Sequence, residues 1–463
     1  MSIKESTRHQ DDRKNQEEDR DPCGERFDYL SDLEKPLDED KVKAARRILE
    51  QLRRPYLRRP GVVGIDVGYR LLQGEDRFKD EVAIRVHVRK KLNGTILEKE
   101  KQLSFSKEKG ARVAGYELGF REHSEEVDGE EKTWVTVNEI PIDVVEAQYL
   151  PSDEIRTLRP RPNNGHFFND DQLKRLTQRS VSPLVGGLSV GNGQGPAGTL
   201  GAVVWDRTDG TPCLLSNWHV LAGSVRATVG QPCFQPAIFD GGQEASDAVA
   251  TLKRWIFDQD GDAALAEILP GHDYCAGEIL GLRFPVMECI EPKLGMEVRK
   301  WGRTTGFTRG FVDGIDFSGT LDYGDAGIQS FENQIHIAPR CRGTQVSAPG
   351  DSGAVWVHSS TNEHTDVEHY YAVALHFAGD VPGSASGEYA IASSIQELSK
   401  RLQFGVRPVF VPPEGYVAQG RRRTELRKLN GRTGGLIQPE GLATGDRNGG
   451  PQPTPEPITG GGG

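Results

Sequence analysis

Hydrophobic positions change their period along the chain, and each change predicts a different kind of element. Apolar residues recur at helical spacing between charged ones at Val42, Ala45, Ile48, Leu49 and Leu52. This pattern predicts a helix over residues 36–55, which Pro55 stops. Residues 82–88 alternate with a period of two, as a half-buried strand does. With further apolar runs on either side, this strand predicts a small α/β domain over residues 56–150.

The second half of the chain has a different pattern. Short apolar runs, separated by glycine, proline and aspartate turns, fill residues 184–405. Such runs are typical of an all-β barrel or sandwich. Residues 151–183 are rich in proline and charge, so they are expected to link the two domains.

The two ends are poor in aliphatic side chains. Residues 1–35 are polar and densely charged, and residues 406–463 are rich in proline, glycine and arginine. Segments of this kind cannot bury enough apolar surface to offset the entropy lost on ordering. We therefore expect a disordered arm at the first end and a disordered tail at the second.

Charge and cysteine usage narrow the class of protein. The 463 residues carry 57 basic and 68 acidic side chains, a net charge of −11, which argues against nucleic acid as the main partner. We expect no contact with a membrane, because no run of apolar residues is long enough to span one. The six cysteines show no Cys-x-x-Cys pair and no zinc spacing. Reduced thiols, a cytoplasmic location and the absence of metal or other cofactors are expected.

Three segments carry candidate chemistry in the order histidine, aspartate, serine. Ser352 lies in Gly350-Asp351-Ser352-Gly353, His219 follows an apolar run, and Asp262 begins another. A serine hydroxyl needs a base to take its proton as it attacks, and a carboxylate can orient that base. Three other acids near Asp262 are alternatives for the third position or plain turn residues, namely Asp247, Asp258 and Asp260.

These motifs resemble those of trypsin-like serine peptidases of the chymotrypsin fold over residues 184–405. The stretch Trp301-Gly302-Arg303-Thr304-Thr305-Gly306, expected to form strand and turn, is similar to one in bacterial trypsin-like peptidases and the plant narrow-leaf protease. The resemblance implies a mainly β fold, a chymotrypsin-like double β-barrel preceded by the small α/β domain. It also implies that the backbone amides of Gly350 and Ser352 form an oxyanion hole, with Asp351 in a supporting role.

The resemblance implies less about substrate specificity. His376 and Phe377 lie where the family's substrate-binding strand is expected. A histidine there resembles glutamyl endopeptidases and viral 3C-like enzymes, in which it contacts an acidic or amide side chain, but a histidine that contacts no substrate fits equally well. Val346 stands about where trypsin has its acidic pocket residue, so cleavage after lysine or arginine is not expected.

The sequence therefore predicts an intracellular serine endopeptidase that hydrolyses protein or peptide substrates through an acyl-enzyme, with His219, Asp262 and Ser352 as its triad. One alternative is a non-catalytic or latent interaction protein that uses a peptidase fold as a binding scaffold. Another is a self-processing enzyme whose N-terminal domain covers the cleft. Similarity to the plant proteins also leaves room for a homo-oligomer.

Overall fold

The structure is a computed structural model that describes residues 23, 28–33, 36–71, 78–89, 112–113, 116–117, 120–127, 130–151, 172, 176–361, 368–380 and 389–408. All of these residues belong to Met1–Gly420, one of two units of the chain. The other unit, Arg421–Gly463, lies outside the described residues, as do residues 409–420 and most of the expected linker.

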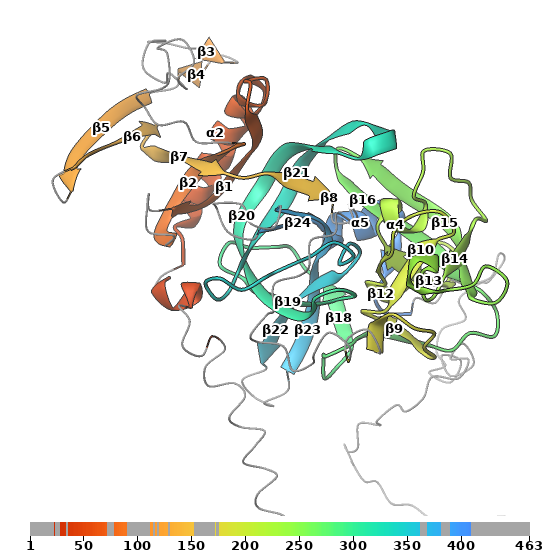
Figure 1. The fold of residues 1–463 in the computed structure, drawn as a ribbon. Coiled ribbons are helices and arrows are strands. Elements are labelled where there is room, and N and C mark those ends of the chain that lie inside the picture. Colours follow the sequence, from red (N-terminus) through yellow and green to blue (C-terminus); the bar gives the residue numbers. More distant parts are fainter. Residues whose placement is uncertain are drawn as a thin grey trace, which may run out of the picture. The chain divides into compact units, whose positions relative to one another are not determined.

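One sheet has ten strands, nine of which come from the first half of the expected peptidase domain (Figure 1). Its strand order is β11-β10-β14-β15-β16-β13-β12-β17-β9, and β25 pairs with β12. The bounds are β9 (Leu184–Gly186), β10 (Ser189–Asn192), β11 (Gly198–Thr199), β12 (Ala202–Asp206), β13 (Pro212–Ser216), β14 (Pro232–Phe234), β15 (Ala248–Asp258), β16 (Gly261–Ile268), β17 (Tyr274–Ile279) and β25 (Phe404–Gly405). Between them lie α4 (Trp218–Leu221) and η2 (Ile238–Asp240).

The other large sheet has thirteen strands in the order β19-β22-β23-β24-β21-β20-β1-β2-β7-β6-β5, with β8 and β18 paired to β23. Because β19 also pairs with β20, the six strands from β19 to β24 close into a barrel. The bounds are β18 (Val286–Cys289), β19 (Glu297–Gly302), β20 (Gly306–Asp322), β21 (Ile328–Pro339), β22 (Val355–Thr361), β23 (Glu368–Asp380) and β24 (Ala390–Ser394), with η3 (Gly324–Ala326) and α5 (Ile395–Leu402). The prediction of a mainly β protein with two sheets, as in a double β-barrel, is confirmed.

The N-terminal strands extend the second sheet. Their bounds are β1 (Val62–Leu71), β2 (Phe78–Val88), β5 (Phe120–Val127), β6 (Glu130–Val137), β7 (Ile140–Glu146) and β8 (Tyr149–Pro151), while β3 (Arg112–Val113) and β4 (Tyr116–Glu117) form a separate pair. β1 pairs with the second half of β20, from Gly64↔Gly319 to Gly68↔Gly314. The region expected as a separate domain at 56–150 therefore shares a sheet with the barrel. The physical reason is that β20 runs past the end of β19 and exposes an edge, which β1 covers.

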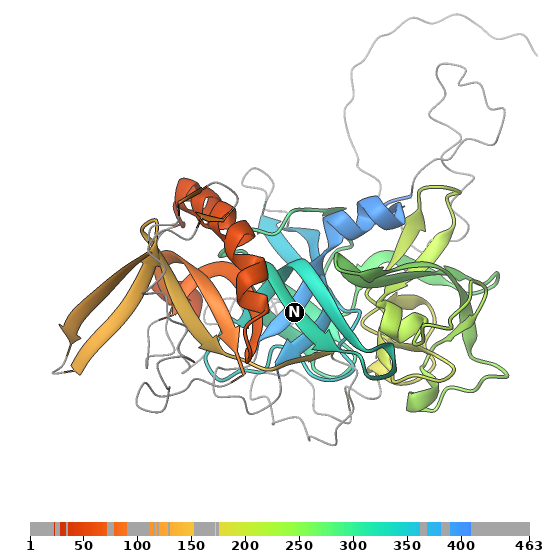
Figure 2. The same ribbon diagram turned by 90° about the horizontal axis from the view of Figure 1, so that it is seen from above.

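Helix α2 (Glu39–Leu57) packs on β1 and β2 (Figure 2). Asp38 caps its first turn by accepting hydrogen bonds from the amides of Asp40 and Lys41. The expectation that Pro55 stops the helix is wrong by two residues, because the helix continues to Leu57. Tyr56 is buried in the core beneath the helix, and this packing holds the last turn beyond the proline.

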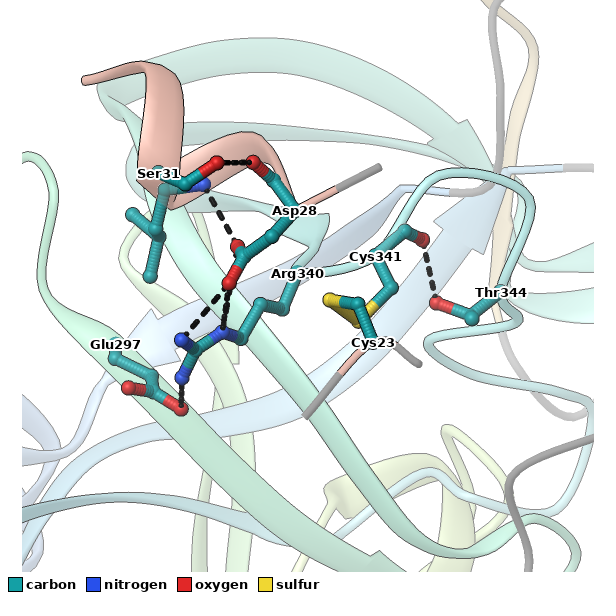
Figure 3. Close-up of a disulfide and its surroundings, with 8 residues drawn as sticks. Cys23, Asp28, Ser31, Glu297, Arg340, Cys341 and Thr344 are labelled. Atoms are coloured by element: carbon teal, nitrogen blue, oxygen red, sulfur yellow. Dashed lines mark hydrogen bonds and ion pairs between the residues drawn. A yellow bond between two sulfur atoms is a disulfide. The ribbon is translucent and has the colours of Figure 1, made fainter. Parts of the chain in front are cut away.

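Part of the N-terminal arm is tied to the barrel by a disulfide between Cys23 and Cys341, whose Cα atoms lie 5.4 Å apart (Figure 3). Beside it, η1 (Tyr29–Asp32) follows Asp28, which forms an ion pair with Arg340 at 3.0 Å. The expectation of reduced thiols is therefore wrong for these two cysteines, since their partners are 318 residues apart and no spacing rule connects them. Of residues 1–35, which we expect to be a disordered arm, the structure describes residues 23 and 28–33, and the others lie outside the described residues. Among the described helices, none combines the length and apolar character that crossing a bilayer requires.

Candidate active site

His219 and Asp262 are brought together by two neighbouring strands of the first sheet. β13 pairs with β16 so that Ser216 lies opposite Ala264, and the chain turns into α4 directly after Ser216. This places the start of α4 over the start of β16, where Asp262 lies. The amides of Trp218 and His219 donate to Asp262 Oδ1 at 2.6 and 3.3 Å.

The Asp262 carboxylate is fully buried and holds the imidazole of His219 through Nδ1, which is hydrogen-bonded to Oδ2. The side chain of Asn217 donates to the Asp262 carbonyl at 2.6 Å and fixes the same turn. With Nδ1 committed to the carboxylate, Nε2 is the nitrogen left to exchange a proton with a substrate or nucleophile.

The three alternative acids have other partners. Arg401 donates to Asp258 at 2.6 Å and to Asp260 at 2.9 Å, at the turn between β15 and β16. Asp247 accepts from the amide of Gln243 at 2.8 Å in a surface loop. Only Asp262 of these four contacts His219 in the described part of the chain.

Ser352 lies in a tight turn directly before β22. Gly350 and Gly353 have φ angles of +96° and +92°, a conformation that a side chain would strain. The carbonyl of Ser352 accepts from the amide of Thr199 at 2.7 Å, and the carbonyl of Thr199 accepts from Ser216 Oγ at 2.7 Å. Thr199 thus bridges this turn to the end of β13, from which His219 follows.

The hydroxyl of Ser352 is buried and makes no hydrogen bond with any described residue. The structure thus brings His219 and Asp262 into contact and places Ser352 nearby, without a hydrogen bond between Ser352 and His219. In ligand-free enzymes such bonds are often long and tighten only when substrate binds. Neither the Gly350 nor the Ser352 amide donates a hydrogen bond within the described ranges, so both are available as donors.

Asp351 fixes the conformation of the turn that carries Ser352, residues 350–353, which we call the serine turn. Its buried carboxylate accepts five hydrogen bonds, from Lys300 Nζ (2.8 Å), Thr305 Oγ1 (2.6 Å) and the amides of Ala348, Thr304 and Thr305 (3.0–3.1 Å). Burial alone would raise the pKa of Asp351, but Lys300 and these donors hold it below its usual value. Burial also lowers the pKa of Lys300, against the pull of Asp351. We take the carboxylate as ionised, because all five groups donate to it.

The Trp301–Gly306 stretch therefore does more than form a turn. It supplies Thr304 and Thr305 to Asp351, and Thr304 Oγ1 also donates to the carbonyl of Pro349 at 2.7 Å. Lys300, one residue upstream, was not a candidate in the sequence. Lys300 lies two residues after Val298, on the same face of the strand, and a lysine on this buried face was the signal that could have identified it.

Tyr323 is a second residue that sequence reasoning missed. It lies in the turn between β20 and β21, and its hydroxyl donates to Asp262 Oδ2 at 2.8 Å. Its ring packs against that of His219, with centroids 5.8 Å apart. No local pattern could reveal this contact, because it joins a hairpin of one sheet to a strand of the other.

The predicted specificity residues lie around the serine turn. The carbonyl of His376 accepts from the amide of Gly353 at 2.8 Å, so β23 passes directly beside Ser352. Burial lowers the pKa of His376 to about 3, which keeps its imidazole neutral near pH 7. The Phe377 ring packs on Phe331, with centroids 5.0 Å apart. Val346 is buried in the barrel core, where it presents no charge.

No group of three or more potential metal ligands occurs within the ranges that the structure describes. The arrangement can supply a nucleophile, a base that is oriented by a carboxylate, and two amide donors.

Comparisons with known proteins give structural likenesses to bacterial serine proteases. A glutamic acid-specific serine protease, described as using a novel histidine triad in substrate binding, is 17% identical over 48% of this chain and 100% of its own, with a TM-score of 0.35. Protease A of Thermobifida fusca is 16% identical over 48% and 96%, with a TM-score of 0.34. The chymotrypsin of Cellulomonas bogoriensis is 16% identical over 49% and 98%, with the same TM-score of 0.34. No family model and no curated protein matches the chain.

Proposed function

We propose that this protein is a serine endopeptidase that cleaves protein or peptide substrates through an acyl-enzyme. The observation that carries the proposal is the contact between His219 and the buried carboxylate of Asp262, on the strand end that Thr199 links to the Ser352 turn. This arrangement supplies the elements of a serine-histidine-aspartate mechanism from three separate parts of the chain.

In the proposed mechanism, Ser352 Oγ bonds to the carbonyl carbon of the substrate while its proton passes to His219 Nε2. Asp262 stabilises the imidazolium that forms, and the amides of Gly350 and Ser352 donate to the oxyanion. Each such donor contributes about 3–4 kcal/mol to stabilising the transition state. His219 then protonates the leaving amine as the acyl-enzyme forms. A water molecule, deprotonated by the same histidine, releases the acyl group.

The proposed specificity excludes basic side chains from the primary pocket. Val346 is apolar and His376 is neutral, so neither offers the negative charge that lysine or arginine requires. A neutral imidazole can donate one hydrogen bond, which suits an acidic or amide side chain. His376 as a substrate contact is part of the proposal.

Location and assembly stay predictions. The cytoplasmic location was expected because the thiols were expected to be reduced, and the Cys23–Cys341 disulfide removes that reason, since disulfides persist mainly in oxidising compartments. Alkylation of free thiols in intact cells, followed by mass spectrometry of these two residues, decides the point. A homo-oligomer and the absence of nucleic acid binding likewise stay predictions.

Labelling with a small serine-reactive phosphonate tests the proposal. We expect the wild-type protein to gain the mass of the probe on Ser352, and Ser352→Ala and His219→Ala to gain none. Ser347→Ala is the matched control, because it alters a serine of the same loop and should label normally. If a folded wild-type sample is not labelled, or if Ser352→Ala is labelled equally, the proposal is wrong and a binding scaffold becomes the better interpretation.

A further inference from the structure

The edge of β23 next to Ser352 is already occupied by another segment of the chain. A β-strand has two hydrogen-bonding edges. β24 covers one edge of β23 from Ala374 to Gly379. β22 covers the opposite edge, but only as far as the pair Val355↔Leu375.

β8 continues that opposite edge. It pairs antiparallel with β23 at Ala378↔Pro151, Gly379↔Leu150 and Asp380↔Tyr149 (Figure 1). Because β24 already takes the other edge at Ala378 and Gly379, β8 must lie on the side of β22.

The same edge leads directly to the serine turn. His376, two residues before the first β8 pair, accepts from the amide of Gly353 at 2.8 Å and donates to the carbonyl of Ala354 at 2.9 Å. Ser352, β22 and β8 therefore lie along one edge of β23. β8 runs antiparallel to β23 and so heads toward the end where Ser352 lies.

An open strand edge beside a nucleophile is where an extended peptide can add as a further strand. Backbone hydrogen bonds then give affinity, and alternate side chains give specificity. We propose that β8 is an intramolecular inhibitor, because it occupies the edge of β23 from Ala378 to Asp380 to which the backbone of an extended peptide substrate would otherwise add. This inference rests on the proposed function and adds that the site is blocked in the structure observed.

β8 is held in place by contacts outside β23. The Tyr149 hydroxyl is hydrogen-bonded to His87 Nδ1 at 2.8 Å and to His336 Nε2 at 2.9 Å, all three being buried. The amide of Ala147, two residues before β8, donates to the carbonyl of Val88 at 2.9 Å. These contacts tie β8 to β2 and β21. A substrate must therefore compete with a tethered strand, and its apparent affinity is its intrinsic affinity multiplied by the fraction of molecules in which β8 has left the edge.

Two probes with the same reactive group distinguish the occupation of the β23 edge by β8 from the reactivity of Ser352. One is a small phosphonate with no peptide extension, and the other is a tripeptidyl phosphonate that needs the β23 edge. Leu150→Pro removes the amide opposite Gly379 while keeping an extended backbone, and Leu150→Ala is its control with the amide intact. We expect Leu150→Pro to react roughly tenfold faster with the tripeptidyl probe and unchanged with the small one. Leu150→Ala should behave as wild type with both.

Hydrogen exchange on the wild-type protein gives a readout that needs no variant. We expect the amides of residues 149–150 and 378–380 to be protected in the free protein. After covalent reaction with the tripeptidyl probe, exchange should increase at 149–150 and stay slow at 378–380, while the small probe changes neither. The inference is overturned if residues 149–150 keep their protection under the tripeptidyl probe, or if folded Leu150→Pro shows no selective acceleration. Failure of both probes to label folded wild type instead overturns the proposed function, and this inference with it.

Discussion

Asp262 accepts four hydrogen bonds through one carboxylate, two from backbone amides, one from His219 and one from Tyr323. The amides fix its position relative to α4, and the hydroxyl of Tyr323 reaches it from the other sheet. Asp262 and His219 could be proposed from the sequence because each adjoins an apolar strand. Sequence reasoning missed Tyr323 and Lys300, which act through tertiary contacts alone.

Tyr323→Phe tests the role of this hydroxyl as a positioning group. We expect the rate of phosphonate labelling to fall roughly three- to tenfold, because Asp262 loses one of the bonds that fix its orientation. Tyr370→Phe, which removes a hydroxyl bonded to Glu368 at 2.7 Å, is the control. An unchanged labelling rate in Tyr323→Phe would contradict the assignment.

Lys300→Met tests whether the ion pair between Lys300 and Asp351 stabilises the serine turn. Removing the ammonium leaves the Asp351 carboxylate buried without its charge partner, so the free energy of unfolding should fall by about 3–5 kcal/mol. Labelling of Ser352 should be lost with it, because Asp351 fixes the turn that carries the two amides. Urea denaturation and labelling measure the two effects, with Lys293→Met, an exposed lysine, as control. The double variant Lys300→Met/Asp351→Asn should recover part of the stability, and a fully stable Lys300→Met would refute the prediction.

Individual helices and strands differ in how well their own residues predict them. The 3.6-residue period over α2 and the alternation in β2 are local, so both elements were predictable from their own residues. β8 has three residues, one of them proline, and carries no period at all. Its place is set by register with β23, more than 200 positions away in the sequence, which no local pattern encodes. The length of β20 could not be predicted from its sequence either, because glycines interrupt its apolar pattern.

The contact between β1 and β7 gives a pH-dependent prediction. Burial raises the pKa of Asp143 to about 6, although it accepts from the amide of Leu71 at 2.8 Å. A carboxyl with a raised pKa favours folding when protonated, so its contribution is fully present below about pH 4 and is lost as the pH rises through 6. Over that range, relative to Asp143→Asn, the wild-type protein should lose up to about 3 kcal/mol of unfolding free energy. Urea denaturation of both proteins from pH 4 to 8 measures it, and parallel curves would contradict it.

At the scale of the whole molecule, the N-terminal region and the barrel form one sheet. The composition of residues 151–183 suggested a boundary between two domains, and that inference treated each sheet as complete in itself. A strand edge is a row of unpaired backbone donors and acceptors. β1 pairs with this edge of β20, although the composition of residues 151–183 resembles that of a linker between domains. The three triad positions could be proposed from the sequence because the motifs are short and ordered, whereas their support comes from distant strands.

The Cys23–Cys341 disulfide predicts a redox-dependent stability for the whole chain. Removing it in Cys23→Ser/Cys341→Ser should lower the unfolding free energy by about 2–5 kcal/mol, because the unfolded chain regains the freedom of a very long loop. A reductant should destabilise the wild-type protein by the same amount and leave the variant unchanged. Thermal melts of both proteins, with and without reductant, measure this. Equal melting temperatures in all four samples would show that the bond does not form.

β8 precedes the barrel in the sequence, and this order matters during synthesis of the chain. A ribosome completes Tyr149–Pro151 well before it completes Ser352, so under our proposal the nucleophile is assembled against an edge that is already filled. Because occupant and edge belong to one polypeptide, their effective concentration does not change on dilution. The fraction of blocked molecules would then be the same at nanomolar and micromolar protein, unlike inhibition by a separate partner.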